Sequence, residues 1–300
     1  MIPPLLSPAT IRSSASLRRR AAAFAGALAL LPALGSAVTV AGFTEGNGTA
    51  TSDQWTGTIG NGWATAWQQA GADLATGVVN TAPLHAGGNY LQFDDNDATA
   101  AAYIRRQMVN FGEVNLSQPY QLTLSYRFDG SLAQLTTFND RIAIFGDSTA
   151  MTGTGATNTW GLGVVGADNS PSQTVFPGEW YFYDNNGSSA FTSTNMFDTN
   201  LALVAGRTYA ITVDVNPVAG TYDASIDDGV NPVVSAIGLT FRNGATNTSA
   251  SWFHISHNAS AGTDDSAFSV DNIAVVPEPA SASLLLGSLG LLLARRRVAG

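Results

Sequence analysis

The stretch that decides the fold is YQLTLSYRFDG, residues 120–130, in which apolar and polar side chains alternate. Its apolar residues stand at every second position: Tyr120, Leu122, Leu124, Tyr126 and Phe128. Successive side chains of a β-strand point to opposite faces, so a period of two places these five side chains on one face. The stretch therefore predicts a strand with one face in a core and the other towards solvent.

The same alternation returns in TYAITVDVNP, residues 208–217, and in TYDASIDDG, residues 221–229. The turn-forming letters NPVAG lie between them, which predicts a β-hairpin. Further apolar stretches have the length of strands: NYLQF, AAYIRRQM, DRIAIFG, TWGLGVVG, EWYFYD, SWFHISH and FSVDNIAVV. Because Gly, Asn, Asp and Ser separate these stretches and no substantial helix is predicted among them, the sequence indicates an all-β sandwich or jelly roll.

Composition limits the classes of function. The chain has 300 residues, and since a β-sandwich of about 200–250 residues forms a single unit, one principal domain is expected. Between residues 38 and 276, six arginines stand against twenty-one acidic residues, a net charge of −15. Nucleic acid is therefore not an expected partner, because phosphate binding requires clustered positive charge. The absence of cysteine excludes disulfides, thiolate metal sites and cysteine nucleophiles.

The N-terminal segment has the pattern of a secretory signal peptide. The basic stretch RSSASLRRR precedes an apolar run over residues 21–34, and small residues follow at Gly35 and Ala37. We expect a signal peptide over residues 1–37, handled by the Sec translocon and cleaved after Ala37. A structural amphipathic helix is disfavoured, since the run is apolar on all sides.

The C-terminal segment combines three features in order. Pro277, Glu278 and Pro279 precede an uncharged apolar run over residues 280–294, and Arg295, Arg296 and Arg297 follow it. As a helix, this run would be about 22 Å long at about 1.5 Å per residue, which makes a short transmembrane helix. Arginines at its end favour a cytoplasmic C-terminus. The region between the two ends is therefore expected on the outer side of the inner membrane.

This order of features resembles the PEP-CTERM sorting signal of exported envelope and biofilm proteins of Gram-negative bacteria. The resemblance covers residues 277–297. It implies that the protein is transiently anchored in the inner membrane and that an exosortase recognises Pro277, Glu278 and Pro279. The body of the protein would then reach the cell surface or the extracellular matrix. A plain C-terminal anchor with a chance Pro-Glu-Pro is the alternative.

The central region resembles the concanavalin A-like and laminin-G-like jelly rolls. The resemblance is carried by GWATAWQQAG (62–71), GGNYLQF (87–93), the strand from Tyr120 and the closing SVDNIAVV (269–276). It implies a single β-sandwich domain over residues 38–276, between the signal peptide (1–37) and the sorting tail (277–300).

No catalytic residue can be assigned from the sequence. Laminarinase-type jelly rolls carry two glutamates and an aspartate at alternating spacing, whereas Glu45, Glu113 and Glu179 are far apart here. His254 and His257 are three residues apart, so on a strand they face opposite sides and cannot chelate one ion together. His85 is expected in a loop, and no G-x-S-x-G motif is present. A catalytic pair from separate strands stays open.

Calcium is the best-motivated ion, as a structural site and not as a catalytic cofactor. FDDND places Asp94, Asp95 and Asp97 at the end of an expected strand, where hard oxygen ligands can converge. Solvated turns rich in Asp and Asn offer the alternative explanation.

Aromatic residues supply the remaining functional signal. In EWYFYD, Trp180 and Phe182 point one way and Tyr181 and Tyr183 the other, so Trp180, Tyr181 and Tyr183 are candidate glycan contacts. A strand buried on both faces would also account for the aromatic residues of EWYFYD. The sequence favours a non-catalytic exported surface or matrix protein associated with exopolysaccharide. A lectin-like carbohydrate-binding module and a secreted glycan-active enzyme are the alternatives.

Overall fold

The computed structural model describes residues 38–43, 63–70, 74–85, 88–95, 102–108, 115–137, 140–148, 158–166, 177–185, 195–242, 252–258 and 266–277. These residues form fifteen strands and one short 3-10 helix, η1 (Leu132–Gln134), and contain no α-helix. The predicted all-β class is confirmed. The strands are β1 (Val38–Ala41), β2 (Gln68–Ala70), β3 (Leu74–Val79), β4 (Tyr90–Asp95), β5 (Ala102–Gln107), β6 (Tyr120–Phe128), β7 (Arg141–Asp147), β8 (Asn158–Val165), β9 (Glu179–Tyr183), β10 (Met196–Ala202), β11 (Thr208–Asn216), β12 (Thr221–Asp227), β13 (Val234–Thr240), β14 (Trp252–Asn258) and β15 (Ser266–Pro277).

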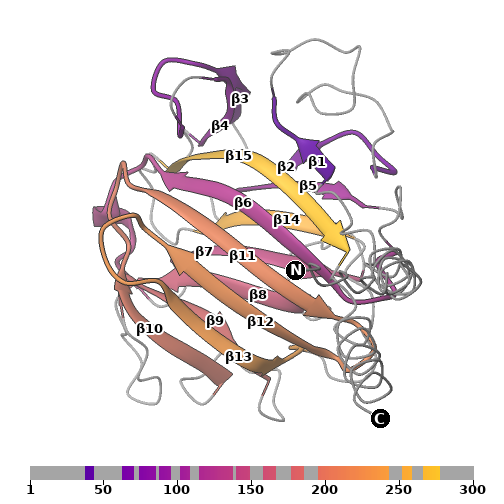
Figure 1. Ribbon diagram of the computed structural model, residues 1–300. Coiled ribbons are helices and arrows are strands. Elements are labelled where there is room, and N and C mark those ends of the chain that lie inside the picture. Colours follow the sequence, from indigo (N-terminus) through magenta and orange to yellow (C-terminus); the bar gives the residue numbers. More distant parts are fainter. Residues whose placement is uncertain are drawn as a thin grey trace, which may run out of the picture. The chain divides into compact units, whose positions relative to one another are not determined.

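The strands form two antiparallel sheets. The eight-stranded sheet has the order β13-β12-β11-β6-β15-β4-β3, with β1 also paired to β15, and the seven-stranded sheet has the order β10-β9-β8-β7-β14-β5-β2. In Figure 1, β6, β11, β12, β13 and β15 lie in front of β7, β8, β9, β10 and β14. The two layers make a β-sandwich of the jelly-roll type, which confirms the predicted architecture.

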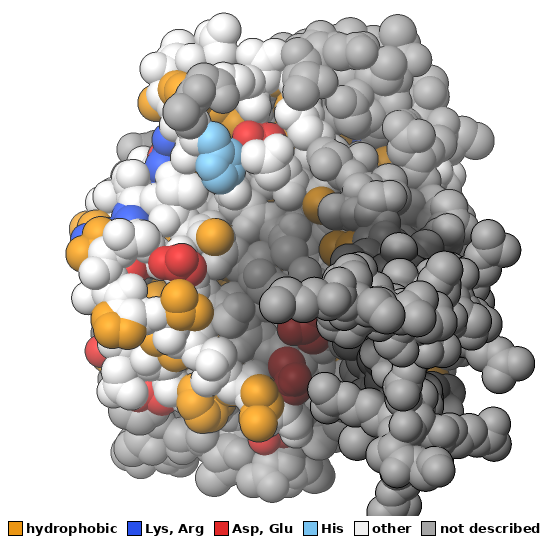
Figure 2. Space-filling model, in the orientation of Figure 1, with side chains coloured by type: hydrophobic (Ala, Val, Ile, Leu, Met, Phe, Trp, Pro, Cys, Tyr) orange, Lys and Arg blue, Asp and Glu red, His pale blue; other side chains and the backbone are white. Residues whose placement is uncertain are grey.

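Strand β6 occupies the middle of the eight-stranded sheet, between β11 and β15, and its five alternating apolar side chains are all buried, as predicted. Its other face differs from the expectation of a solvated surface. Ser125 and Arg127 are only 5% and 8% exposed, because residues of the segment after β3 bond to them. Figure 2 shows this outer face of the sheet.

The predicted hairpin is confirmed as β11 and β12. The pairing runs from Ala210 opposite Asp227 to Asn216 opposite Thr221. The turn closes because Gly220 adopts a positive φ of 69° and donates its backbone N–H to the Asn216 carbonyl at 3.0 Å. Glycine suits this position, since other residues adopt a positive φ only at a cost.

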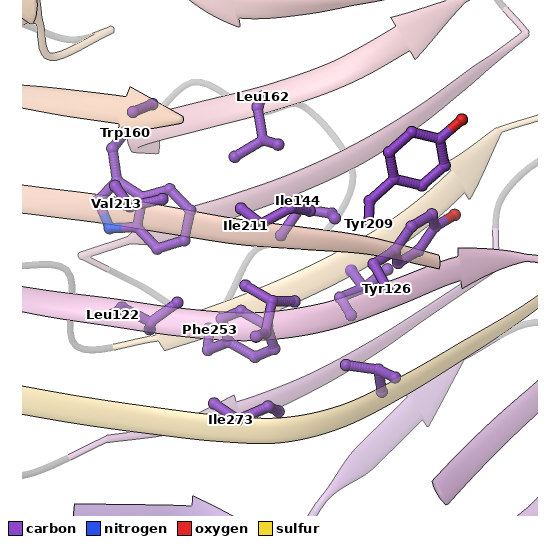
Figure 3. Close-up of a cluster of buried hydrophobic side chains, with 14 of the residues drawn as sticks. Leu122, Tyr126, Ile144, Trp160, Leu162, Tyr209, Ile211, Val213, Phe253 and Ile273 are labelled. Atoms are coloured by element: carbon purple, nitrogen blue, oxygen red, sulfur yellow. The ribbon is translucent and has the colours of Figure 1, made fainter. Parts of the chain in front are cut away.

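The core lies between the two sheets and receives side chains from both (Figure 3). Tyr126 of β6 pairs with Tyr209 of β11, and the indole of Trp180 packs edge-on against both rings, at 5.7 and 5.2 Å between centroids. Each fully buried apolar side chain stabilises the fold by about 1.5–3 kcal/mol relative to exposure. A core of this size explains how the domain folds without disulfides.

Five strands were not predicted: β1, β2, β3, β10 and β13. Four of them are the outermost strands of the two sheets. An edge strand is partly exposed on both faces, so its alternation of apolar and polar residues is weak. β13 shows this, since only Ala236 and Leu239 of its seven residues are buried.

The first and last strands lie together. Val38 of β1 pairs with Val275 of β15, and Pro277, opposite Tyr120, is the last residue of β15. The described part of the chain contains no helix long and apolar enough to span a membrane. The predicted signal peptide and the tail from Glu278 onwards, with Pro279 and Arg295, Arg296 and Arg297, lie outside the described residues.

Candidate functional site

The strand of predicted glycan-contacting rings, β9, is buried on both faces. Trp180 is 0% exposed and lies in the core, while Tyr181 and Tyr183 point to the outer side of the sheet and are 5% and 4% exposed. The alternative explanation of EWYFYD is therefore the one that the structure shows. These three rings are packing residues, because neighbouring side chains and not solvent cover them.

Gly163 of β8 makes room for Tyr181. A Cβ on Gly163 would collide with the carbonyl oxygen of Ile142 and would lie 2.9 Å from the Tyr181 hydroxyl. The guanidinium carbon of Arg242 lies 4.8 Å from the centre of the Tyr183 ring. Burial lowers the pKa of the nearby Arg141, while the Tyr181 hydroxyl opposes this change and the charge of Arg242 adds to it. This half of the face is thus a packed layer of rings and arginines.

The other half of the outer face carries a group of side chains that is partly exposed to solvent. Along β5, Ala102, Ile104 and Arg106 are buried, whereas Tyr103 and Arg105 alternate with them and are half-buried on the opposite side. The antiparallel pairing of β14 with β5 places Trp252 opposite Gln107 and His254 opposite Arg105. The period of two in the sequence and the pairing of β5 with β14 together create the group.

We call this group the Arg105 stack, and it consists of Gln68, Tyr103, Arg105 and Trp252. The guanidinium carbon of Arg105 lies 5.1 Å from the Tyr103 ring centre and 5.4 Å from the Trp252 ring centre. Its Nε donates a hydrogen bond to Gln68 Oε1 at 2.9 Å. Cation–π contacts and this bond fix the orientation of a side chain that would otherwise be flexible. Sequence reasoning missed the stack because its members lie on three strands far apart in the chain.

The histidines face opposite sides of β14, as predicted. His254 stacks on Phe145, with ring centres 4.8 Å apart and planes at 7°, and lies 6.2 Å from the Trp252 ring. His257 points the other way, and its burial lowers its pKa to about 4, against a smaller opposing effect of Asp140. Both rings are buried and take part in packing, so they do not form a chelating pair.

The described residues contain one of the three candidate glutamates, Glu179, and Glu45 and Glu113 lie outside them. The pKa of Glu179 is raised, first by partial burial and then by the charge and hydrogen bond of Asp198 on β10. Asp184 instead accepts hydrogen bonds from the backbone and hydroxyl of Thr240, at 3.0 and 2.5 Å. Glu179 and Asp198 can share a proton, and they belong to β9 and β10, the two strands at one edge of the seven-stranded sheet.

The predicted calcium ligands stand where β4 ends. Asp94 and Asp95 are its last two residues and pair with Ala267 and Ser266, while Asp97 lies outside the described residues. Among the residues that the structure describes, no three His, Asp or Glu side chains gather as a metal site. The calcium site stays a prediction.

The carboxylate oxygens of Asp228, another acidic turn residue, accept hydrogen bonds from neighbouring groups of the protein. It accepts bonds from the backbone of Val230 and Asn231 and from the Arg207 guanidinium, the last at 2.7 Å. Burial raises its pKa, but these hydrogen bonds outweigh burial and lower the pKa to about 2. This carboxylate stabilises a turn and is not presented to a cation.

The fold and this face define the class as an antiparallel jelly-roll β-sandwich with an aromatic and arginine-rich outer sheet. No family model matches the sequence, and no curated protein matches it. Among solved structures, the catalytic domain of a glycoside hydrolase family 131 protein from Coprinopsis cinerea is 14% identical, with 82% of this chain and 96% of that chain covered and a TM-score of 0.50.

Two further solved structures are similar at TM-scores below 0.5. The exoplasmic/lumenal domain of VIP36 is 11% identical, with 73% of this chain and 85% of that one covered and a TM-score of 0.41. A sialidase is 10% identical with a TM-score of 0.47, and the match covers 83% of this chain and 19% of the sialidase. The similarity to the glycoside hydrolase domain shows a shared sandwich fold alone and says nothing about activity.

Proposed function

We propose that the chain is an exported protein of the cell surface or extracellular matrix that binds exopolysaccharide through the outer face of its seven-stranded sheet. The Arg105 stack carries this proposal, because it presents the half-buried ring of Tyr103 and a guanidinium that Gln68 and the buried Trp252 hold in position. The role requires binding only and assigns no catalytic group to this face.

The chemistry of the stack suits a sugar. The face of an aromatic ring packs against the C–H groups of a pyranose. The guanidinium of Arg105 and the side-chain amide of Gln68 can form hydrogen bonds with its hydroxyls. Because the Gln68 bond and the two rings already order Arg105, less side-chain entropy is lost on binding. Tyr103 is the side chain that we expect to contact the sugar most directly, since it is half-exposed at the surface.

The test is co-sedimentation of the purified protein with exopolysaccharide, together with a glycan array. We expect Tyr103→Ala to weaken binding by about 3- to 10-fold, the value of one aromatic contact. Phe197→Ala is the matched control, because Phe197 is an exposed ring on β10, outside the stack. Equal losses in the two variants, or no binding by the wild type, would argue against this face.

We further propose that an exosortase reads Pro277, Glu278 and Pro279 and that Arg295, Arg296 and Arg297 orient the tail in the inner membrane. The position of Pro277 at the end of β15 supports this idea. A cut beyond that residue would leave every described strand intact. Cleavage after Ala37 would likewise leave β1 whole.

A second candidate, self-association within a matrix, is favoured by the exposed edge around β13. Val230, Val233 and Ile237 are 71%, 58% and 82% exposed, and an open groove of about 670 Å³ runs beside them between Asn200–Ala202 and Asn231–Ser235. Exposed apolar side chains on an edge strand favour pairing between molecules. Sedimentation velocity over a concentration series tests it, and Ile237→Lys should abolish any association.

A further inference from the structure

A second cluster of reactive side chains lies on the opposite surface of the sandwich, the outer face of the eight-stranded sheet. We call it the Ser125 cluster, and it consists of His85, Ser125 and Asp271. His85 Nε2 lies 2.7 Å from Ser125 Oγ. Asp271 of β15 stands directly opposite Ser125 of β6 in the strand pairing. The three residues are 40 and 146 positions apart in sequence, so pairing of the strands and folding of the segment after β3 bring them together.

The carboxyl group of Asp271 interacts electrostatically with the same imidazole. Burial raises the pKa of Asp271 to about 6, while its bond from the Asn272 backbone and the charge of His85 act in the opposite direction. His85 is exposed and Ser125 is largely buried. Figure 2 shows a histidine at the surface of this face with an acidic side chain beside it. A ligand can therefore approach the cluster from solvent on the histidine side.

The segment that carries His85 is held by other contacts. Arg127 Nη1 donates to the carbonyl of Ala82 at 2.6 Å, and the Ala82 N–H donates to the Tyr90 hydroxyl at 3.3 Å. Arg127 is itself fixed by its ion pair with Asp129, at 2.5 Å between Nε and Oδ1. Because these bonds anchor the segment, the contact between His85 and Ser125 is not needed to keep it on the sheet.

A serine hydroxyl within hydrogen-bond distance of an imidazole, with a carboxylate near both, is the starting arrangement of an activated nucleophile. We propose that Ser125, His85 and Asp271 form such an array and that it hydrolyses small acyl esters at this surface. Ser125 is the nucleophile, His85 is the general base, and Asp271 is a positioning residue that stabilises the charged imidazole. This activity is additional to glycan binding on the opposite sheet and does not depend on it.

The reaction balances with water as the only co-substrate. Ser125 Oγ bonds to the acyl carbon while His85 Nε2 takes the hydroxyl proton, and the ester C–O bond then breaks as this proton passes to the departing alcohol. Water attacks the acyl-serine, with His85 taking a proton from the water and returning it to Ser125 Oγ. The products are an alcohol and a carboxylic acid. Arg127 lies two residues along β6 and on the same face, and we assign to it the stabilisation of the developing oxyanion.

The experiment uses the full chain, p-nitrophenyl acetate as substrate and a fluorophosphonate as a probe for a reactive serine. We expect the wild type to hydrolyse the ester and to carry the probe on Ser125, as located by mass spectrometry. Ser125→Ala and His85→Gln should each lower kcat by about 100-fold or more, the usual contribution of general-base catalysis. Asp271→Asn should lower kcat by about tenfold, leave KM unchanged and shift the pH profile.

Ser225→Ala is the matched control, since Ser225 is a half-buried serine on β12 of the same sheet, and it should retain wild-type rates. His85→Gln guards against misfolding, because an exposed glutamine can still bond to Ser125. Hydrolysis no faster than in buffer, an unlabelled Ser125 in folded wild type, or full activity in Ser125→Ala would each overturn the proposal. The contact between His85 and Ser125 would then be a structural hydrogen bond only.

Discussion

Val38 and Val275 are paired across β1 and β15, so the strand that follows the predicted signal peptide and the strand that precedes the predicted sorting tail end side by side. Pro277 lies two residues beyond Val275 and still pairs with Tyr120. The predicted signal cleavage position and the predicted sorting motif therefore border the folded sandwich directly. Processing at either one removes sequence without removing a described strand.

Replacing Pro277, Glu278 and Pro279 with alanine should leave the protein at full length in the inner membrane. The apolar run and the arginines remain, so insertion is unaffected, and alanine can extend β15 as proline does. Neutral replacements at 295–297 should instead let the tail pass through the bilayer, because the cytoplasmic charge is lost. Fractionation and immunoblotting in a host with an exosortase distinguish the two. Cleavage and release of the triple-alanine protein would refute the sorting-signal proposal.

Gly163→Ala should lower the free energy of unfolding by about 2 kcal/mol or more, as overpacking does in a core. The new methyl group would meet the Ile142 carbonyl and the Tyr181 hydroxyl, and neither can move without disturbing the pairing of β7 with β8 or the buried layer. Gly161→Ala is the control, because its nearest neighbour would be Phe145 Cβ at 3.4 Å. Urea unfolding measures both, and equal stability of the two variants would contradict the packing argument.

Trp180→Ala should destabilise the domain by about 3–5 kcal/mol, as other truncations of large buried rings do. The indole contacts Tyr126 and Tyr209 in the core, so its loss leaves a cavity between the sheets. Folded Trp180→Ala protein should nevertheless bind polysaccharide as the wild type does, whereas the Tyr103→Ala protein should bind it about 3- to 10-fold more weakly. Loss of binding with unchanged stability would mean that Trp180 contacts the ligand after all.

Asp271→Asn should stabilise the protein at pH 7 and have no effect below pH 4. The pKa of Asp271 is raised to about 6 in the folded chain, above its unfolded value of about 3.9, so the folded state holds the proton more tightly. The wild type therefore loses stability relative to the variant as the pH rises from about 4 through 6. We expect a difference of about 1 kcal/mol after allowing for solvent screening, measured by urea unfolding at several pH values.

Millimolar calcium should raise the melting temperature relative to chelator, through Asp94, Asp95 and Asp97. An ion that binds only the folded state stabilises it by mass action. Asp97→Asn should reduce the increase, because a neutral amide is a weaker ligand for this ion than a carboxylate. Asp223→Asn on β12 is a control for general charge effects. An identical melting temperature with chelator and with calcium would exclude the site.

The alternation in residues 120–130 and 208–229 determined three strands, one hairpin and the buried face of each, since the side-chain period of a strand is a local property. The sequence could not determine whether the second face of a strand is covered. The alternation of Trp180, Tyr181 and Tyr183 is the same whether their strand lies at a surface or under other side chains. The alternation likewise predicts a solvated Ser125, whereas His85 of the segment after β3 contacts it. Only the tertiary structure brought Arg105 to Trp252 and His85 to Ser125, because strand pairing and loop closure join residues whose separation in sequence carries no local signal.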